Sequence, residues 1–170
     1  MNLLIEFPVA ASLAACILQF ASAWNALGKG RRAVEPADDG DLPGVSILKP
    51  LKGVDDRLLD NLESFCRLDY PRYEIVFCVQ GASDPALRVA RRVKETHPER
   101  EIVVVVGDCR EGLNPKVNNM MPGYAAARYP FVLISDSNVA PAPGYLREAM
   151  AHFRDPSGGL VATWSAVSAR

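Results

Sequence analysis

The run Ser135-Asp136-Ser137-Asn138 directly follows an apolar stretch, residues 131–134 (FVLI). An apolar run that ends on a carboxylate is typical of a buried strand whose carboxyl end carries a functional side chain. Carboxylate, amide and hydroxyl oxygens are the hard ligands that Mg²⁺ and Mn²⁺ take in proteins. An ordinary turn uses the same residue types. The rest of the sequence must therefore distinguish a metal site from a turn.

Three further polar loops each follow an apolar run, and they contain Lys49 and Asp55 (KPLKGVD), Asp84 (QGASD) and Lys116 (GDCREGLNPK). The carboxyl ends of parallel strands meet at one edge of a sheet, and ligands bind in the crevice outside that edge. We therefore expect these four residues and Asp136 to converge on one rim. A lysine there can neutralise phosphate oxygens beside a bound cation, as a diphosphate leaving group requires.

An alternating series of strands and helices is needed to place these loops. Apolar runs predict strands at residues 45–48, 73–79, 102–106, 131–134 and 160–163. Helical spacing and capping signals predict helices after residue 56, after residue 85, from residue 115 and over 143–153, with Pro122-Gly123 kinking or splitting the third. Residues 102–106 are all β-branched, which predicts a strand buried on both faces. The fold class is therefore α/β, Rossmann-like, with a mostly parallel sheet covered by helices on both faces.

Several of the polar residues have a purely structural alternative. Asp55 precedes a helical pattern, and the Asp84-Pro85 and Asn114-Pro115 pairs are typical helix starts, so each can act as an N-cap. For the remaining polar residues the alternative is simple exposure to solvent: Lys49, Lys116, Asn118 and Asn119.

Composition and missing motifs exclude several functions. The formal net charge is −1, from 19 basic and 20 acidic residues, so we expect no nucleic-acid partner. The chain has no GxGxxG, GxxxxGK[ST] or GxSxG motif, which disfavours a dinucleotide-dependent oxidoreductase, a P-loop enzyme and a serine hydrolase. The four cysteines form no CxxC pair, so neither a zinc site nor a disulfide framework is expected, and buried thiols suit a reducing compartment.

The amino-terminal region differs from the rest. Residues 7–24 carry no charged side chain, and that length is enough to cross a hydrocarbon core of about 30 Å. We expect residues 1–26 to form a single-pass transmembrane anchor and residues 27–43 a linker. Lys29, Arg31 and Arg32 follow the apolar run, which favours a cytoplasmic location for the downstream domain. A secretory signal peptide ending near Ala23 and a buried amphipathic helix are the alternatives.

The segments GVSILKPLKGVD, YEIVFCVQGASDPA and GLNPKVNNMMPGYAAARYPFVLISDSNV resemble the ceramide glucosyltransferases and their bacterial relatives, including the hopanoid-associated glycosyltransferases. The resemblance covers residues 44–167. It implies a GT-A (nucleotide-diphospho-sugar transferase) fold and a membrane-bound, inverting enzyme. Such an enzyme transfers a sugar from a uridine diphosphate sugar (UDP-glucose or UDP-N-acetylglucosamine) to a membrane lipid hydroxyl such as that of ceramide or a hopanoid, with Mg²⁺ or Mn²⁺.

The same resemblance implies roles for individual residues. The family's first aspartate falls on Asp55, expected near the nucleotide, and its second on Asp136, expected near the metal and diphosphate. Asp84 falls where similar enzymes touch the uracil base, and Lys116 would face the donor. The usual DxD metal motif is Asp136-Ser137-Asn138 in this chain, so Asn138 would offer a carbonyl oxygen without a charge.

The family pattern also includes residues that this sequence does not contain. The aspartate that acts as general base and the (Q/R)xxRW motif are expected beyond Arg170. Residues 44–170 are therefore expected to be the donor-binding half of the enzyme, truncated before the acceptor half. A non-catalytic domain that binds a nucleotide sugar or a protein partner is the alternative.

Overall fold

The computed structural model describes residues 19, 42–107, 112–154 and 159–160. All of the strands and helices discussed below belong to one compact unit, Pro36–Arg170. Among the described residues, no helix combines the length and the hydropathy needed to cross a bilayer. Nearly all of the expected anchor (residues 1–26) and of the expected linker (residues 27–43) lies outside the described residues.

Four parallel strands form a single sheet in the order β3-β2-β1-β4. The strands are β1 (Val45–Leu51), β2 (Tyr73–Val79), β3 (Ile102–Val106) and β4 (Phe131–Ile134). The helices are α2 (Leu58–Cys66), α3 (Ala86–Thr96), α4 (Pro115–Ala126) and α5 (Tyr145–Ala151), followed by a short 3₁₀ helix, η2 (His152–Arg154). The predicted α/β class with a parallel sheet is confirmed. The expected strand at 160–163 falls mostly outside the described residues.

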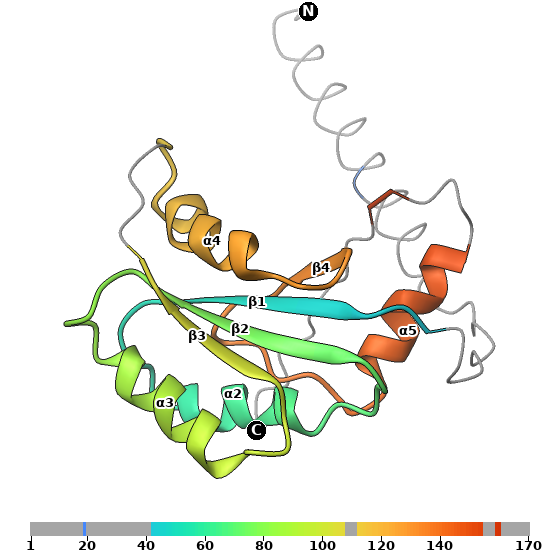
Figure 1. Cartoon of the computed structure of the whole chain (residues 1–170), viewed down its shortest axis with the longest axis horizontal. Helices are drawn as coiled ribbons and strands as arrows, with labels where there is room; N and C mark the ends of the chain where they lie inside the picture. The colour runs from blue at the N-terminus through green and yellow to red at the C-terminus, as the bar shows by residue number, and fades with distance from the viewer. Residues whose placement is uncertain (1–18, 20–41, 108–111, 155–158, 161–170) are drawn as a thin grey trace, which may run out of the picture. The chain divides into compact units, whose positions relative to one another are not determined.

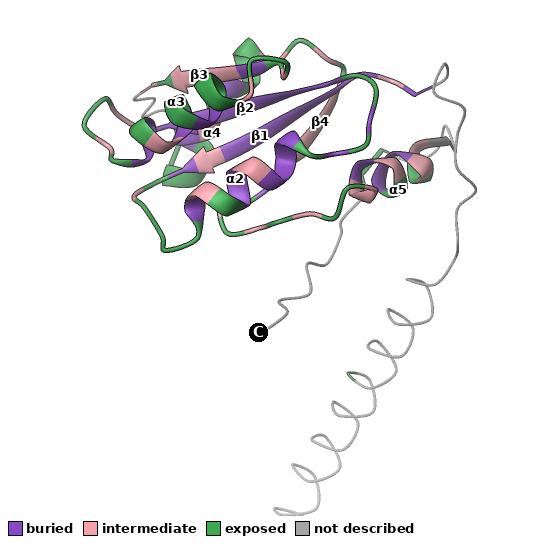
Figure 2. Ribbon diagram, turned by 90° about the horizontal axis from the view of Figure 1, so that it is seen from below, coloured by how far each residue is buried: buried purple, intermediate pink, exposed green. Residues whose placement is uncertain are grey.

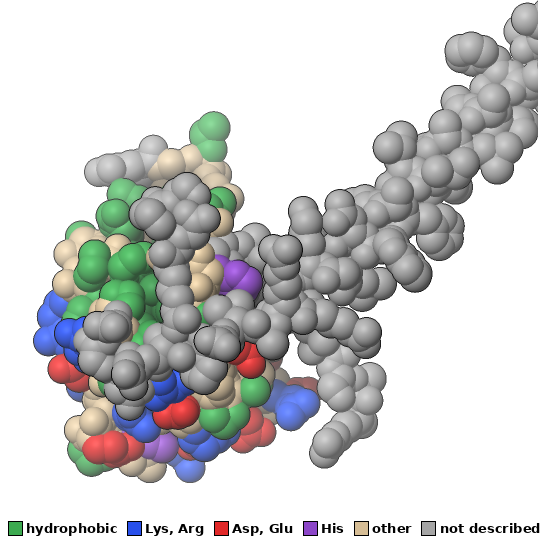
Figure 3. Space-filling view, turned by 90° about the vertical axis from the view of Figure 1, so that its right-hand side faces the viewer, with side chains coloured by type: hydrophobic (Ala, Val, Ile, Leu, Met, Phe, Trp, Pro, Cys, Tyr) green, Lys and Arg blue, Asp and Glu red, His purple; other side chains and the backbone are tan. Residues whose placement is uncertain are grey.

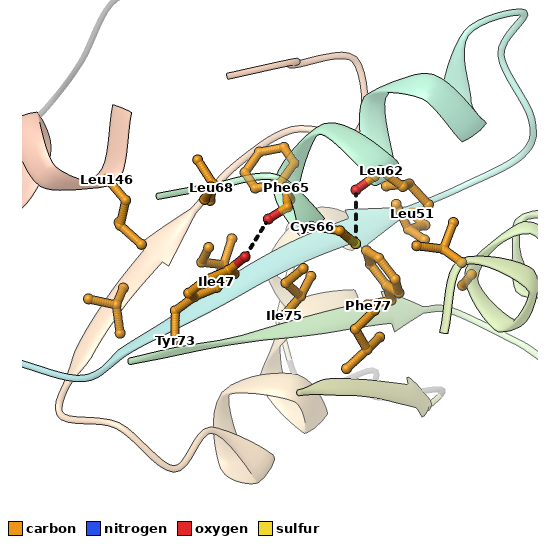
Figure 4. Packing of buried hydrophobic residues seen from close by; sticks show 14 of the residues in the cluster. Ile47, Leu51, Leu62, Phe65, Cys66, Leu68, Tyr73, Ile75, Phe77 and Leu146 are labelled. Atoms are coloured by element: carbon orange, nitrogen blue, oxygen red, sulfur yellow. Dashed lines mark hydrogen bonds between the residues drawn. The ribbon is translucent and has the colours of Figure 1, made fainter. Parts of the chain in front are cut away.

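Helices cover both faces of the sheet. In Figure 1, α2 and α3 lie on one face and α4 lies on the other. The larger core fills the α2–α3 face, where side chains of α2 such as Leu62 and Phe65 pack on Ile47, Ile75 and Phe77 of the two central strands (Figure 4). A smaller apolar cluster, centred on Leu48, Val76 and Cys78, lies on the other face.

The strand order determines which strands are buried. Figure 2 shows β1 and β2 buried along almost their whole length, whereas β3 and β4 are partly exposed. The prediction that residues 102–106 are buried on both faces is wrong, because β3 is the edge strand of the described sheet, paired there with β2 alone, and Val106 is 41% exposed. A run of β-branched residues therefore indicated a strand here but not a central one.

Helix α4 continues through Pro122, so the expected split at Pro122-Gly123 is wrong. The two residues instead allow α4 to lie close to the sheet. A Cβ atom on Gly123 would lie 2.2 Å from the sulfur of Cys78 in β2, so only glycine permits this approach. Pro122 lies against Gly107 at the end of β3. The outer surface of α4 exposes Val117, Met121 and Tyr124.

Charged and apolar side chains are separated on the surface. The side view in Figure 3 shows hydrophobic side chains gathered above a belt of charged ones. The exposed ion pairs include one within a helix turn, Arg67 with Glu63, and one between distant parts of the sequence, Arg147 with Asp69.

Candidate functional site

A cleft of about 480 Å³ lies outside the carboxyl ends of the strands. The cleft lies where the order of the strands changes direction. From β1 the sheet extends through β2 to β3 on one side, and β4 pairs with β1 on the other side. This is the position at which open α/β sheets bind their ligands. Its polar side chains come from the segments that follow the strands: Lys52, Asp55, Gln80, Asn114, Lys116, Asn119, Asp136, Ser137 and Asn138. Four residues predicted from the sequence, Asp55, Lys116, Asp136 and Asn138, are therefore brought together.

Asp136 and Lys116 form an ion pair at this cleft. The Lys116 ammonium donates to the Asp136 carboxylate, and both side chains are about half exposed. The local sequence places Lys116 there because Asn114 caps α4, its side-chain oxygen accepting a hydrogen bond from the Lys116 backbone N–H at 2.9 Å. The capping interpretation of Asn114-Pro115 is thus confirmed. The solvent-exposed alternative for Lys116 holds only in part, since its ammonium is paired.

Asp55 is exposed and lines the cleft. The alternative that Asp55 serves as an N-cap is wrong, because α2 begins at Leu58 without a side-chain capping bond. Asp55 contributes only its backbone carbonyl, which accepts from the Leu58 N–H at 3.0 Å. Its carboxylate is therefore not used by the start of the helix.

Asp84 lies outside the cleft lining and makes structural hydrogen bonds. Its Oδ1 atom accepts from the backbone N–H of Ala86 at 2.9 Å and from that of Gly53 at 3.0 Å. The first bond caps the start of α3. The bond from Gly53 links the loop after β1 to the start of α3. Gly53 has a φ of 68°, a left-handed conformation that favours glycine. The bond from Ala86 supports the capping alternative for Asp84, although the N-cap position of α3 is Pro85. Contact with a base stays a prediction.

Lys49 does not line the cleft. Its side chain is fully buried, and its ammonium donates to the Asp136 carbonyl oxygen at 2.6 Å. The same ammonium lies 3.8 Å from the centre of the Phe65 ring. Burial lowers the pKa of Lys49 to about 7, although the nearby Asp136 carboxylate acts to raise it. The alternative that Lys49 is an exposed strand end is wrong, because Lys49 points to the same side of β1 as Ile47 and Leu51.

Two asparagines of α4 hold the walls of the cleft in place. The Asn119 side-chain N–H donates to the Leu51 carbonyl at the end of β1, at 3.0 Å. Asn118 donates to the Gly112 carbonyl and accepts from the Gly112 N–H, both at 2.8 Å. Both asparagines are at most 9% exposed, so the solvent-facing alternative for them is wrong.

Gln80 was missed by the sequence reasoning. It lines the cleft directly after the last residue of β2. The rule that points to Asp136, a polar residue following a buried strand, applies equally to Gln80. The position of Gln80 after a buried strand could therefore have identified it, although a neutral amide is a weaker indication of a metal or phosphate site than a carboxylate.

The donor set fits a hard cation that is only partly held by protein. Within the described residues, no group of three or more His, Cys, Asp or Glu side chains could hold a metal ion. The cleft offers the Asp136 carboxylate, with Asn138, Ser137 and Asp55 along the same lining. Mg²⁺-type ions commonly use one or two carboxylates, with water and substrate phosphates as further ligands. The oxygen-rich lining fits that pattern, and a closed all-protein cage is not present among these residues.

Comparison with known proteins identifies several relatives. The family profile described as glycosyl transferase family 21 matches residues 7–170. Ceramide glucosyltransferase 1 of Caenorhabditis elegans is 48% identical over 110 residues, which are 65% of this chain and 23% of that protein. Ceramide glucosyltransferase of Komagataella phaffii is 38% identical over 111 residues, which are 63% of this chain and 22% of that protein. The chain thus spans about a quarter of the length of the curated relatives that it matches.

Solved structures share the fold. The mannosyltransferase PcManGT from Pyrobaculum calidifontis, in complex with GDP-Man and Mn²⁺, superposes with a TM-score of 0.67 at 25% identity, covering 88% of this chain and 43% of that one. TarS 1–349 from S. aureus superposes with a TM-score of 0.53 at 19% identity, covering 66% of this chain and 32% of that one. The described sheet and helices therefore have the architecture of GT-A-like glycosyltransferases.

Proposed function

The chain belongs to glycosyl transferase family 21, and we propose that its sheet-edge cleft binds a nucleotide-sugar donor and a divalent cation for sugar transfer to a membrane lipid. The observation that carries this proposal is the convergence of Asp55, Lys116, Asp136 and Asn138 on one cleft at the switch point of the sheet. The PcManGT complex with GDP-Man and Mn²⁺ supports a metal-assisted donor site on this fold.

Each cleft residue has a definite part in the proposal. Asp136 and Asn138 supply oxygen ligands to Mg²⁺ or Mn²⁺, and the bound cation neutralises charge on the diphosphate. Lys116 binds a phosphate oxygen as a point charge. Asp55 accepts hydrogen bonds from the nucleoside. UDP-glucose or UDP-N-acetylglucosamine is the proposed donor, and ceramide, a hopanoid or a similar lipid alcohol is the proposed acceptor.

The proposed reaction inverts the configuration at the anomeric carbon. The lipid hydroxyl oxygen forms a bond to that carbon while the bond from the carbon to the diphosphate oxygen breaks on the opposite side. Negative charge accumulates on the departing nucleoside diphosphate, and in this proposal Lys116, which lines the cleft, neutralises part of it. The hydroxyl proton passes to a general base, which the family resemblance implies is an aspartate.

We also propose that residues 1–26 anchor the chain in a membrane with the domain on the cytoplasmic side. A lipid acceptor stays in the bilayer, so an anchor brings the donor site to it. Extraction at alkaline pH tests the anchor, and protease protection in sealed vesicles tests the orientation. Release of the chain into the soluble fraction would refute the anchor, and protection of the domain inside the vesicles would refute the orientation.

Titration calorimetry of the full chain, in a mild detergent, tests the donor site. We expect UDP to bind in the presence of Mn²⁺ and to bind much more weakly without it. Asp136→Ala should abolish the metal dependence. Glu95→Ala, which removes an exposed carboxylate near the end of α3, is the control and should preserve it. A parallel titration with GDP tests the choice of base. A folded chain that binds neither nucleotide would overturn the proposal.

Binding and transfer need separate measurements. If UDP binds but no sugar reaches a ceramide or hopanoid acceptor in mixed micelles, the non-catalytic binding function is favoured for this chain. Product formation would establish the transferase.

A further inference from the structure

One buried ammonium supports the loop that presents Asp136 to the cleft. The Lys49 Nζ atom lies 2.6 Å from the Asp136 carbonyl oxygen, 3.5 Å from the Val139 carbonyl oxygen and 3.5 Å from Ser135 Oγ. These three contacts span loop 135–139, which follows β4. The first two residues and the last residue of this loop therefore each contact a single side chain of the neighbouring strand β1.

This arrangement is costly for the fold. Lysine is almost never fully buried unless it is paired, because taking an ammonium out of water is unfavourable. Lys49 is 0% exposed and stands in β1 between Ile47 and Leu51, at a position where an apolar side chain would suit the core. The Phe65 ring and the loop carbonyls compensate only part of the lost hydration. Polar groups kept at such a cost are commonly found near functional sites.

The two ends of Asp136 are held by different lysines. Its backbone carbonyl accepts from Lys49 on the buried side, while its carboxylate pairs with Lys116 on the cleft side. With the carbonyl fixed inward, the carboxylate stays directed at the cleft. Asn138 lies in the same loop and also lines the cleft, so the Lys49 contacts constrain both predicted metal ligands.

We propose that Lys49 is a positioning residue that fixes loop 135–139, so that Asp136 and Asn138 hold the cation and diphosphate of the donor. This inference rests on the proposed function of the cleft. It gives Lys49 no contact with the donor, which distinguishes it from a phosphate-binding lysine. It also differs from a purely structural role, because the fold itself does not benefit from a buried ammonium.

The variant Lys49→Met separates these roles. Methionine has a similar shape, removes the buried charge and cannot donate to the loop. Loss of the buried ammonium removes its desolvation cost, which offsets the donor that the loop carbonyls lose, so we expect the melting temperature to stay unchanged or to rise. We expect amide hydrogen exchange in loop 135–139 to become faster. Affinity for UDP with Mn²⁺ should fall by about 10- to 100-fold, as when support behind metal ligands is lost.

Two further variants serve as controls. Val93→Ala removes volume from the core at α3, away from the cleft, and should lower the melting temperature without changing loop exchange or affinity. Lys49→Gln keeps a neutral donor, so it should restore part of the loop protection, and it replaces Lys49→Met if the latter does not fold.

The outcomes separate the two proposals. If the wild-type chain binds no nucleotide, the proposed function fails, and the Lys49 role fails with it. If the wild-type chain binds and the Lys49 variants keep the wild-type affinity or the wild-type loop exchange, only the Lys49 role is overturned. Faster loop exchange together with weaker binding, at unchanged or higher stability, is the result that the proposal requires.

Discussion

The ammonium of Lys116, in the first turn of α4, pairs with the carboxylate of Asp136, in the loop after β4. The two residues come from different elements and meet at the cleft because α4 packs across β1, β2 and β3, which brings its first turn to the loop after β4. An exposed ion pair of this kind adds little to stability, about 0–1 kcal/mol. Its significance lies instead in the cleft, where Lys116 supplies the positive charge that a bound cation would otherwise supply to Asp136.

Lys116→Ala should therefore uncouple the cation from the nucleotide. Without the ammonium, Asp136 loses the partner that competes with the cation, and affinity for Mn²⁺ alone should rise by about 2- to 5-fold, the equivalent of an exposed ion pair. Affinity for UDP with Mn²⁺ should fall by about 10-fold, since a charge-assisted hydrogen bond to phosphate is lost. Manganese paramagnetic resonance and calorimetry measure the two affinities. Lys94→Ala, an exposed change on α3, is the matched control. If the affinity for Mn²⁺ alone and the affinity for UDP with Mn²⁺ fell equally, Lys116 would not compete with the cation for Asp136.

Asp84 offers a test of capping against base recognition. Asp84→Ala removes the acceptor for the Ala86 and Gly53 N–H groups and should lower the free energy of unfolding by about 1–2 kcal/mol. Asp84→Asn keeps one acceptor oxygen, so its stability should be close to that of the wild type. Urea denaturation measures both variants. If the asparagine variant is stable but discriminates poorly between UDP and GDP, then Asp84 also contacts the base. If it keeps the wild-type preference, capping alone explains the residue.

Much of this architecture follows from local sequence signals, and the rest depends on strand order. Apolar runs and capping pairs located the strands and helices, and the rule that ligands bind at the carboxyl edge brought Asp55, Lys116 and Asp136 together. The edge position of β3 could not be predicted, because a β-branched run does not reveal how many neighbours a strand has. Lys49 was predicted to be exposed because lysine is rarely buried. Its position in the strand, two residues from both Ile47 and Leu51, places it on their buried face.

Titration of Lys49 should make stability depend on pH. Burial lowers the pKa of Lys49 from 10.5 to about 7 in the folded chain. Between these values the unfolded chain binds more protons than the folded chain, so the free energy of unfolding rises with pH. Integration of this difference gives a gain of about 2 kcal/mol between pH 7 and pH 9. From about pH 8 upwards the effect is opposed by Cys66 and Cys78, because burial raises the pKa of each thiol from 9.0 to about 11 and the unfolded chain loses its thiol protons first.

Urea denaturation at pH 7, 8 and 9, in the presence of a metal chelator, measures this dependence. Lys49→Met should remove the slope, because no buried amine is left to titrate. A Lys49→Met chain that keeps the full slope would show that another group is responsible. A wild-type chain whose stability falls over this range would show that Lys49 stays charged with an ordinary pKa.

The close packing of α4 on β2 leads to a last prediction. A Cβ atom on Gly123 would lie 2.2 Å from the Cys78 sulfur and 3.3 Å from Val76 Cγ1. Gly123→Ala should therefore push α4 away from the sheet and lower the free energy of unfolding by about 1–3 kcal/mol, the usual cost of overpacking. Because Lys116 and Asn119 are on the same helix, affinity for UDP with Mn²⁺ should fall as well.

Cys78→Ala removes the sulfur that the new methyl group would meet, so it should compensate for Gly123→Ala. The double variant should be more stable than the sum of the two single changes predicts, with a coupling energy of about 1 kcal/mol or more, as expected for residues in contact. Binding of UDP should recover in parallel, because α4 can return to its position over β2. Additive losses in stability would mean that α4 is displaced by something other than the contact between residues 78 and 123, and that the helix is not held at the cleft by this contact.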